Sequence, residues 1–265
     1  MHVQFNDACK NNDMETVKLM INKVNNETIK SGFIEACDSG HLDVVEYFVD
    51  QSKSIDVHTY NTCFQNACIN GHLDVVEYFV VHGVDIHTRN IGFELACDNY
   101  NFYVMEYLKS RVNIHAYIKS FKNACNNGHI NVVNYLKSSV DIDVWTDGFR
   151  LACENKHLTI VKYLRTFVEI DARIDNFKKA CKDGNSSVAE LLLSINIKID
   201  ARTEGFIAAC KNGQIDVVMC LVPNIDINAH NLGFQFASLS GKWKVVNYLR
   251  PYVVESNAHT EGLCL

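Results

Sequence analysis

Apolar residues recur along the chain at the spacing of one buried helix face. In the segment Phe93-Glu94-Leu95-Ala96-Cys97, the residues Phe93, Ala96 and Cys97 stand at positions i, i+3 and i+4. A second apolar run follows each such segment after a short polar turn, as in residues 73–80. The pattern therefore predicts pairs of short helices joined by tight turns.

The first segment of each pair recurs nine times at almost constant spacing. Successive anchors are 28 to 31 residues apart, and they are Phe5, Phe33, Phe64, Phe93, Phe121, Phe149, Phe177, Phe206 and Phe234. A fixed period in this range indicates one supersecondary unit copied and stacked, not a globular enzyme core. We predict one domain over residues 1–265, with nine repeats of about 28–31 residues and a truncated tenth at 259–265.

Turn residues indicate where the helices end. Glycine tolerates the left-handed backbone of a helix C-cap, and it follows most first helices, at Gly40, Gly71, Gly128, Gly184, Gly213 and Gly241. Between a second helix and the next anchor, Val84-Asp85-Ile86-His87 alternates apolar and polar residues. This alternation predicts a short extended piece, followed by a polar loop that leads to the next helix at Gly92.

The succession of helix, tight turn, antiparallel helix and projecting loop resembles the ankyrin repeat. The best matches are residues 40–47 and 71–78, both reading Gly-His-Leu-Asp-Val-Val-Glu-Tyr, and the Asp-Ile-Asn-Ala segment at 226–229. The chain lacks the family's Thr-Pro-Leu-His opening, and its repeats fall about four or five residues short of the usual 33. The missing residues belong mainly to the finger between Thr88 and Phe93.

The resemblance implies an all-α, ankyrin-like solenoid of stacked helix-turn-helix repeats. It further implies a non-catalytic scaffold that binds a protein partner through a concave face and finger loops. Compact repeats rich in Asn, Ile and Lys are similar to the ankyrin arrays of amoebae and of the giant DNA viruses that infect them. That similarity implies a viral protein engaging a host target in the host cytoplasm.

Charge is uneven along the chain. The net charge is −6; residues 1–132 contain 10 Lys and Arg against 16 Asp and Glu, and residues 133–265 contain 15 of each. A general nucleic-acid binder is normally basic overall, so this composition argues against that class.

The cysteines indicate a reducing compartment. Eight of the 11 occupy one repeat slot, at Cys9, Cys37, Cys68, Cys97, Cys125, Cys153, Cys181 and Cys210. Equivalent positions in stacked helices lie roughly 8–10 Å apart, whereas a disulfide needs Cα atoms within about 7 Å. We therefore expect buried thiols. With no secretion segment and no run long enough to span a bilayer, we expect an intracellular, cytoplasmic protein.

Histidines share repeat slots as well, so a metal site has to be considered. His41, His72, His129 and His157 occupy one slot, but zinc needs ligands that converge on one point. In the ankyrin family this histidine serves the turn between helices, bonding neighbouring backbone. A catalytic Cys-His pair needs a distinctive site with a shifted pKa. The cysteines here stand in similar sequence contexts in successive repeats, so none is distinguished as catalytic. We therefore expect no cofactor, no metal and no enzyme activity.

One column of residues is a candidate partner site. Four residues before the Phe anchors from Phe64 to Phe234 stand Tyr60, Arg89, Tyr117, Trp145, Arg173, Arg202 and His230, and His259 stands four before Leu263. Tyr, Trp and Arg often carry interface energy. The ankyrin pattern itself often has a basic residue here, which accounts for the arginines but not for Tyr60, Tyr117 and Trp145. We predict that this column lies in the fingers and contacts a partner.

A second candidate surface is the open face of the first helices. Its charges change sign along the chain, from Glu35, Asp38, Glu94 and Asp98 to Lys122, Arg150, Lys178, Lys179, Lys182 and Lys211. We expect Lys178, Lys179 and Lys182 to contact an acidic patch of a protein partner. We further expect the protein to be a monomer and not to bind membranes. The alternative is an anionic ligand or nucleic acid bound by the basic band of repeats five to eight, with a steep salt dependence.

Overall fold

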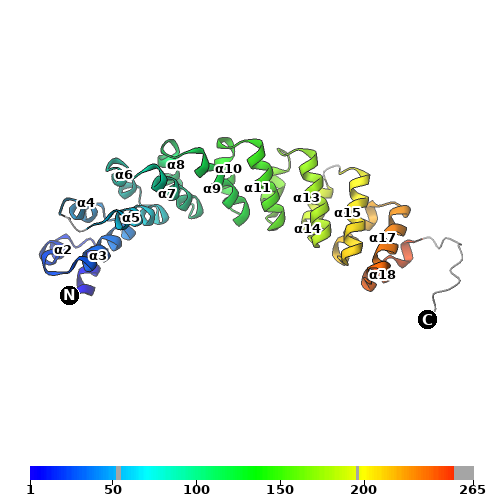
Figure 1. The fold of residues 1–265 in the computed structure, drawn as a ribbon, viewed down its shortest axis with the longest axis horizontal. Coiled ribbons are helices and arrows are strands. Elements are labelled where there is room, and N and C mark those ends of the chain that lie inside the picture. Colours follow the sequence, from blue (N-terminus) through cyan, green and yellow to red (C-terminus); the bar gives the residue numbers. More distant parts are fainter. Residues whose placement is uncertain (52–54, 195–196, 254–265) are drawn as a thin grey trace. The chain divides into compact units, whose positions relative to one another are not determined.

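The computed structural model describes residues 1–51, 55–194 and 197–253, and these residues form helices and turns without a strand (Figure 1). The chain divides into two compact units. The first contains residues 1–124 and 129–141, and the second contains residues 125–128 and the described part of 142–265. Each unit is a stack of helix pairs, as the sequence predicts.

The first unit contains the N-terminal helix pairs. Their first helices are α1 (His2–Lys10), α3 (Asn26–Ser39), α5 (Val57–Asn70), α7 (Ile86–Asp98) and α9 (Ile114–Asn127), although the last residues of α9 group with the second unit. Their second helices are α2 (Met14–Met20), α4 (Leu42–Gln51), α6 (Leu73–Val81), α8 (Phe102–Leu108) and α10 (Ile130–Leu136). Short 3-10 turns follow three of these, at η1 (Ile21–Lys23), η2 (Lys109–Arg111) and η3 (Lys137–Ser139).

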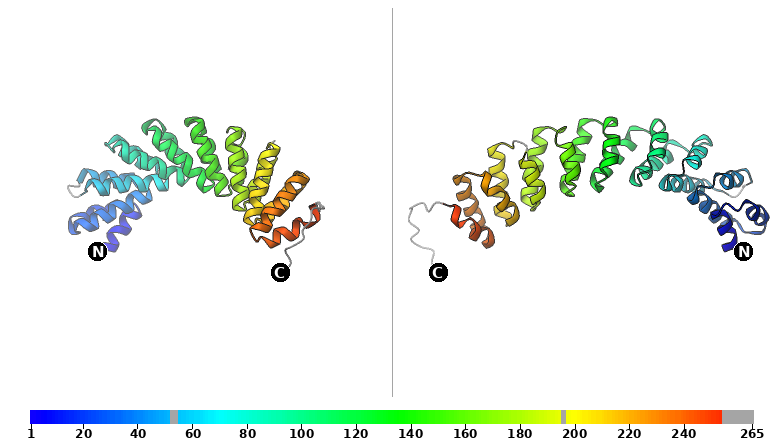
Figure 2. Two further views of the ribbon diagram at one scale, coloured as in Figure 1. Left: turned by 45° about the vertical axis from the view of Figure 1, so that its right-hand side comes forward. Right: turned by 180° about the vertical axis from the view of Figure 1, so that it is seen from behind.

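The second unit repeats the arrangement. Its first helices are α11 (Ile142–Glu154), α13 (Ile170–Asp183), α15 (Ile199–Asn212) and α17 (Ile227–Leu239). Its second helices are α12 (Leu158–Leu164), α14 (Ser186–Leu193), α16 (Ile215–Leu221) and α18 (Trp243–Leu249), with 3-10 turns at η4 (Val222–Asn224) and η5 (Arg250–Tyr252). Within each unit, first helices pack on first helices and second helices on second helices (Figure 2).

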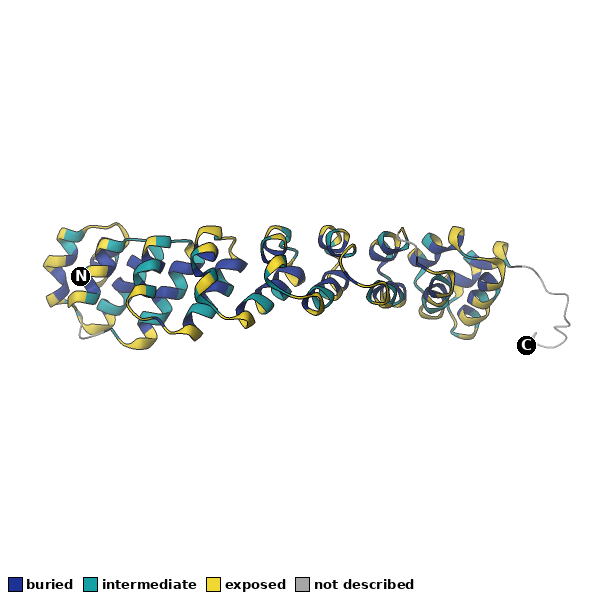
Figure 3. Ribbon diagram, turned by 90° about the horizontal axis from the view of Figure 1, so that it is seen from above, coloured by how far each residue is buried: buried dark blue, intermediate teal, exposed yellow. Residues whose placement is uncertain are grey.

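The Phe-x-x-Ala-Cys segments form the core of both units. The anchors from Phe5 to Phe206 are fully buried, and the cysteine slot is buried from Cys9 to Cys210. Figure 3 shows these buried faces turned toward neighbouring helices, with exposed residues on the opposite sides. Phe234 is the exception, because it is only half-buried in α17. The predicted tenth repeat at 259–265 lies outside the described residues.

Neighbouring first helices approach closely at the residue before each anchor. A Cβ atom added to Gly92 in α7 would lie 2.5 Å from the Phe64 ring and 2.8 Å from the Cys68 Sγ of α5. Gly32, Gly205 and Gly233 meet the anchor and the cysteine of their preceding repeats in the same way. The slot therefore requires a small residue, and it also holds Cys63, Ser120, Gly148 and Asn176.

The first helices begin earlier than the sequence analysis places them. Helix α7 begins at Ile86, so the extended piece expected at Val84–His87 is wrong. The reason is an N-cap: the Asp85 carboxylate accepts a hydrogen bond from the backbone N–H of Thr88 at 2.7 Å. Asp56 caps α5 through Thr59 in the same way, at 2.8 Å. Capping satisfies backbone donors that a helix start leaves unpaired.

The predicted C-caps are confirmed at Gly40, Gly71, Gly184 and Gly213, whereas the C-cap of α17 is Ser240, one residue before Gly241. The six glycines that follow first helices all have positive φ, between 67° and 84°. Three repeats hold a different residue at this turn position with the same backbone, namely Asn12, Tyr100 and Lys156. Asp43, Asp74 and Asp216 lie in the first turns of second helices, as expected from the helix dipole. No helix within the described residues is long and apolar enough to cross a membrane.

Candidate binding surface

The predicted finger column lies in helices, not in loops. Tyr60, Arg89, Tyr117, Trp145, Arg173, Arg202 and His230 are each the fourth residue of a first helix, from α5 to α17. The prediction of a loop location is therefore wrong. In α5, α7 and α17 the reason is the one given for the helix starts, because Asp56, Asp85 and Asp226 cap these helices where a finger was expected. His259 lies outside the described residues.

The three aromatic members of this column pack within the array. The Tyr60 ring lies 4.5 Å from the Phe79 ring, the Tyr117 ring 5.1 Å from Phe93, and the Trp145 ring 6.0 Å from Phe167, all with edge-to-face geometry. Edge-to-face contacts of this kind stabilise a fold. Packing is thus one physical reason for aromatic residues here, which the sequence alone did not provide.

Several polar ends of the column bind the connection that precedes the helix. Arg202 Nε donates to the carbonyl oxygen of Ile197 at 2.7 Å, and His230 Nε2 donates to that of Val222 at 3.2 Å. The Tyr117 hydroxyl donates to the carbonyl oxygen of Lys109. These bonds satisfy carbonyl groups at the ends of second helices and their turns. Arg89 and Arg173 differ, because their Nε atoms are buried without a hydrogen-bond partner among the described residues.

Tyr60 borders an open hollow. The hollow has a volume of about 300 Å³ and lies between the starts of α5 and α7, lined by Ile55, Asp56, Val57, Tyr60, Asn61, Gly83, Val84 and Asp85. Burial raises the pKa of the Tyr60 hydroxyl to about 12. The hydroxyl is protonated at neutral pH, as tyrosine ordinarily is, and can donate a hydrogen bond. Of the column residues, Tyr60 thus combines packing with a place on an accessible concavity.

The shared histidine slot links consecutive repeats through the backbone, as the resemblance implies. His41 Nε2 donates to the Lys10 carbonyl oxygen at 2.7 Å, His72 Nε2 to that of Asp38 at 2.8 Å, and His157 Nε2 to that of Asn126 at 2.8 Å. Asn101, Asn185 and Gln214 occupy the same slot and bond the preceding repeat through their amides. These side chains hold the turns of neighbouring repeats together.

Two of the three lysines expected to meet an acidic patch already have partners. Lys178 of α13 pairs with Glu204 of α15, and Lys179 pairs with Glu154 of α11 at 2.7 Å. The Lys182 ammonium makes no ion pair with a described residue and is exposed. The three lysines line a shallow hollow of about 430 Å³ with Asp183, Glu204 and Ala208. The basic band is therefore partly neutralised by its own repeats.

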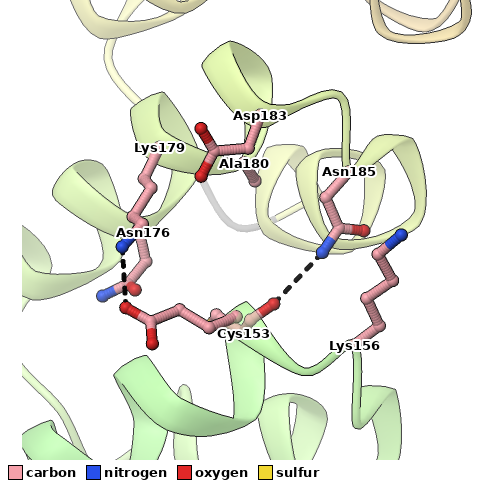
Figure 4. Close-up of a pocket in the computed structure, with 8 residues that line it drawn as sticks. Cys153, Lys156, Asn176, Lys179, Ala180, Asp183 and Asn185 are labelled. Atoms are coloured by element: carbon pink, nitrogen blue, oxygen red, sulfur yellow. Dashed lines mark hydrogen bonds and ion pairs between the residues drawn. The ribbon is translucent and has the colours of Figure 1, made fainter.

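A smaller pocket lies between α11 and α13 in the second unit (Figure 4). It has a volume of about 230 Å³ and is lined by Cys153, Glu154, Lys156, Asn176, Lys179, Ala180, Asp183 and Asn185. Asn185 Nδ2 closes one side by donating to the Cys153 carbonyl oxygen at 3.1 Å. The Lys179–Glu154 pair closes another, and Arg150 Nη1 also bonds Glu154, at 3.1 Å. The lining thus carries charges of both signs.

The buried cysteines are poor nucleophiles. Burial raises the pKa of Cys9, Cys97, Cys125, Cys153, Cys181 and Cys210 to about 12, and it raises that of Cys68 as well. A thiol with such a pKa is protonated at neutral pH, whereas nucleophilic and metal-binding cysteines react as thiolates. Within the described residues, no cluster of three or more His, Cys, Asp or Glu side chains is arranged to hold a metal ion.

Comparison with known proteins supports the repeat assignment. Residues 5–90 match the family model for ankyrin repeats, in three copies, and this stretch extends from α1 into α7. No curated protein matches the chain. The helix pairs that follow, up to α15 and α16, have the same buried Phe and Cys slots as the matched stretch, whereas α17 has the half-buried Phe234 and Ser238 in these slots. The fold is therefore an all-α, ankyrin-like solenoid of stacked helix-turn-helix repeats.

Proposed function

We propose that this protein is a non-catalytic scaffold that binds another protein through the face formed by its first helices and their turns. The observation that carries the proposal is a contrast between buried and exposed positions. The Phe and Cys slots repeat through both units, but the residue after each cysteine is more exposed and changes freely, from the half-buried Asp38 and Asp98 to the exposed Glu154 and Lys182. Packing dictates the buried residues, and the exposed ones are left to recognition.

A stacked array suits this role because its surface is formed before a partner arrives. Side chains held by short, capped helices lose little conformational entropy on association, so more of the contact energy contributes to affinity. In ankyrin arrays the first helices and turns line the concave face, and we assign the partner to the corresponding residues here. The resemblance to arrays of amoebae and their giant viruses makes a host protein the candidate partner.

Two groups of residues are proposed to contact the partner. The first is the column Tyr60, Arg89, Tyr117, Trp145, Arg173 and Arg202, whose half-buried side chains pack at one end and reach the surface at the other. The second is Lys178, Lys179 and Lys182 on α13. Within it, Lys182 is proposed to bind an acidic side chain directly, because its ammonium has no partner among the described residues.

The alternative of an anionic ligand or nucleic acid is less well supported. Such binding relies on unpaired cations, since each phosphate contact releases counterions. Glu154 and Glu204 neutralise two of the three lysines on α13. Salt dependence separates the two functions: binding through phosphates should weaken steeply between about 50 and 200 mM salt, whereas binding through packed aromatic side chains should not.

An affinity pull-down compares the chain's two tryptophans directly. Trp145 is half-buried in the first helix α11, whereas Trp243 starts the second helix α18 and is 66% exposed. A specific protein should be retained by wild type and by Trp243→Ala, and be lost with Trp145→Ala and with Lys182→Glu, all at unchanged fold by circular dichroism. Loss with Trp243→Ala alone would overturn the assignment to the first helices. Recovery of nucleic acid in place of a protein would overturn the scaffold function itself.

A further inference from the structure

Tyr100 occupies a position that glycine holds in most repeats. Its φ is +61°, in the left-handed region, and the equivalent residues include Gly40, Gly71 and Gly128. The left-handed conformation is unfavourable for residues with a Cβ atom, least so for Asn and Asp. Asn12 therefore fits this turn position easily, whereas a tyrosine there carries backbone strain.

Tyr100 also disturbs the link to the next repeat. Its ring lies 4.5 Å from the imidazole of His129, which shares the slot of His41, His72 and His157. Those three histidines bond the preceding repeat. His129 makes no such bond among the described residues, and its Nδ1 is buried without a partner. The turn at Tyr100 therefore lacks a hydrogen bond to its backbone that the turns at Gly40, Gly71 and Gly128 have.

Tyr100 and two aromatic residues that follow it are exposed to solvent. Tyr103 is 82% exposed, Tyr100 45% and Phe102 37%. The corresponding residues after Gly71 are His72, Leu73 and Asp74, so this composition is not a demand of the fold. Backbone strain that the fold does not require is typical of functional sites, and exposed tyrosines are typical of binding hot spots.

An acidic group lies beside these rings. Asp98 ends α7, is half-buried, and makes no hydrogen bond or ion pair with a described residue. Burial raises the pKa of its carboxyl, and His129 and Lys119 lie close enough to oppose that shift. The Lys119 ammonium is itself paired with Glu94. Asp98 and Tyr100 thus both lie near the imidazole of His129. The Asp98 carboxylate forms no ion pair with a described residue.

We propose that the turn from Asp98 to Tyr103 is a docking site for an arginine-containing segment of the partner protein. The guanidinium pairs with the Asp98 carboxylate and lies against the exposed ring of Tyr100. Arginine fits better than lysine, because its planar group bonds a carboxylate through two N–H groups and also stacks on aromatic faces. The excess of acidic residues in the first half of the chain favours a basic segment. The inference rests on the proposed scaffold function and names the chemistry of the partner.

The test uses random peptides displayed on phage, selected against the full chain. Enriched peptides should contain arginine, and their affinity is then measured by fluorescence polarisation. Tyr100→Gly and Asp98→Asn should each weaken binding by at least about tenfold, which corresponds to about 1.4 kcal/mol. Lys156→Gly is the matched control, because it relieves the same backbone conformation in the second unit away from Asp98. It should leave the affinity unchanged.

The outcomes separate this site from the scaffold function. Peptides that bind Tyr100→Gly as tightly as wild type would overturn the docking site and leave the scaffold function standing. Enrichment of acidic peptides would overturn the arginine assignment. If no peptide is enriched, the docking site is overturned, and if the pull-down also retains no protein, the scaffold function falls with it. Because Tyr100→Gly relieves strain, its melting temperature should not fall, so unfolding would not account for lost binding.

Discussion

Gly92 of α7 lies directly against the Phe64 ring of α5, so close that a single added carbon atom would stand 2.5 Å from it. Four glycines before anchors make this contact with the preceding repeat. The contact explains why small residues recur before the anchors that follow another repeat: the ring of one repeat fills the space that a side chain of the next would need. Stacking therefore depends on pairs of residues about one repeat apart.

Gly92→Ala should destabilise the protein although alanine is the better helix former. Helix propensity favours alanine by about 1 kcal/mol, but overpacking a buried ring costs typically 1–3 kcal/mol. We expect a net loss of about 1 kcal/mol, measured by urea denaturation. The double variant Phe64→Leu/Gly92→Ala provides room for the new methyl group, so its loss should be smaller than the sum of the two single losses. An increase in stability for Gly92→Ala would contradict the close packing.

Phe149→Ala tests the anchor column. Phe149 is fully buried in α11, and removing such a ring typically costs about 3–5 kcal/mol. Phe234→Ala is the matched control in α17, where the anchor is half-buried, so its loss should be distinctly smaller. Both are read from thermal and urea unfolding. Equal losses would mean that the two anchors are buried to the same extent in solution.

The repeat register can be predicted from sequence because packing repeats it. A buried slot such as that of Phe93 and Cys97 accepts few residue types, so the same letters return at each period. The predicted helix starts are misplaced because the alternation in Val84–His87 resembles a strand. Asp85 followed three residues later by Thr88 is the available signal of an N-cap.

The candidate site is less predictable than the fold. The ring contact of Tyr60 with Phe79 joins residues of two helices, and a single repeat read by itself does not reveal it. Whether Lys179 has an acidic partner depends on Glu154 of the preceding repeat. Tyr100 stands out in the sequence because most repeats have glycine at this position. The strain of its backbone and the missing hydrogen bond of His129 can be recognised only in the structure.

Tyr100→Gly should raise the melting temperature. The substitution removes a left-handed tyrosine and allows His129 to bond the preceding repeat, as its sibling histidines do. Glycine increases the entropy of the unfolded chain, which offsets part of the gain. A net gain of about 1 kcal/mol corresponds to roughly 2–4 °C for a protein of this size. Lys156→Gly relieves the backbone alone and should give a smaller rise, since Asn185 already bonds Cys153. A fall for Tyr100→Gly would show that the ring contact outweighs the strain.

Acid should weaken the contact between α3 and α5 through Asp56. Its carboxylate lies 2.7 Å from Lys30 Nζ and caps Thr59. The Lys30 hydrogen bond is the largest cause that holds the pKa of Asp56 well below its usual range, followed by the bonds from Thr59. A group whose pKa is lowered by folding contributes stability above its unfolded pKa of about 3.9, and this contribution is lost as pH falls through the folded pKa. Lys30, whose pKa is raised, stays protonated throughout this range.

Asp56→Asn isolates this effect, because asparagine caps a helix about as well as aspartate but does not titrate. At pH 7 the variant should melt below wild type, and the difference should shrink as the pH falls below about 4. Asp85→Asn is the matched control: Asp85 makes the same capping bond to Thr88 without a lysine partner among the described residues, and the pKa of its carboxyl is lowered mainly by that bond. The melting temperature of Asp85→Asn should differ from that of wild type by less than that of Asp56→Asn does, at every pH. A difference for Asp56→Asn that persists unchanged down to about pH 2.5 would mean that the Lys30 pair does not stabilise the fold.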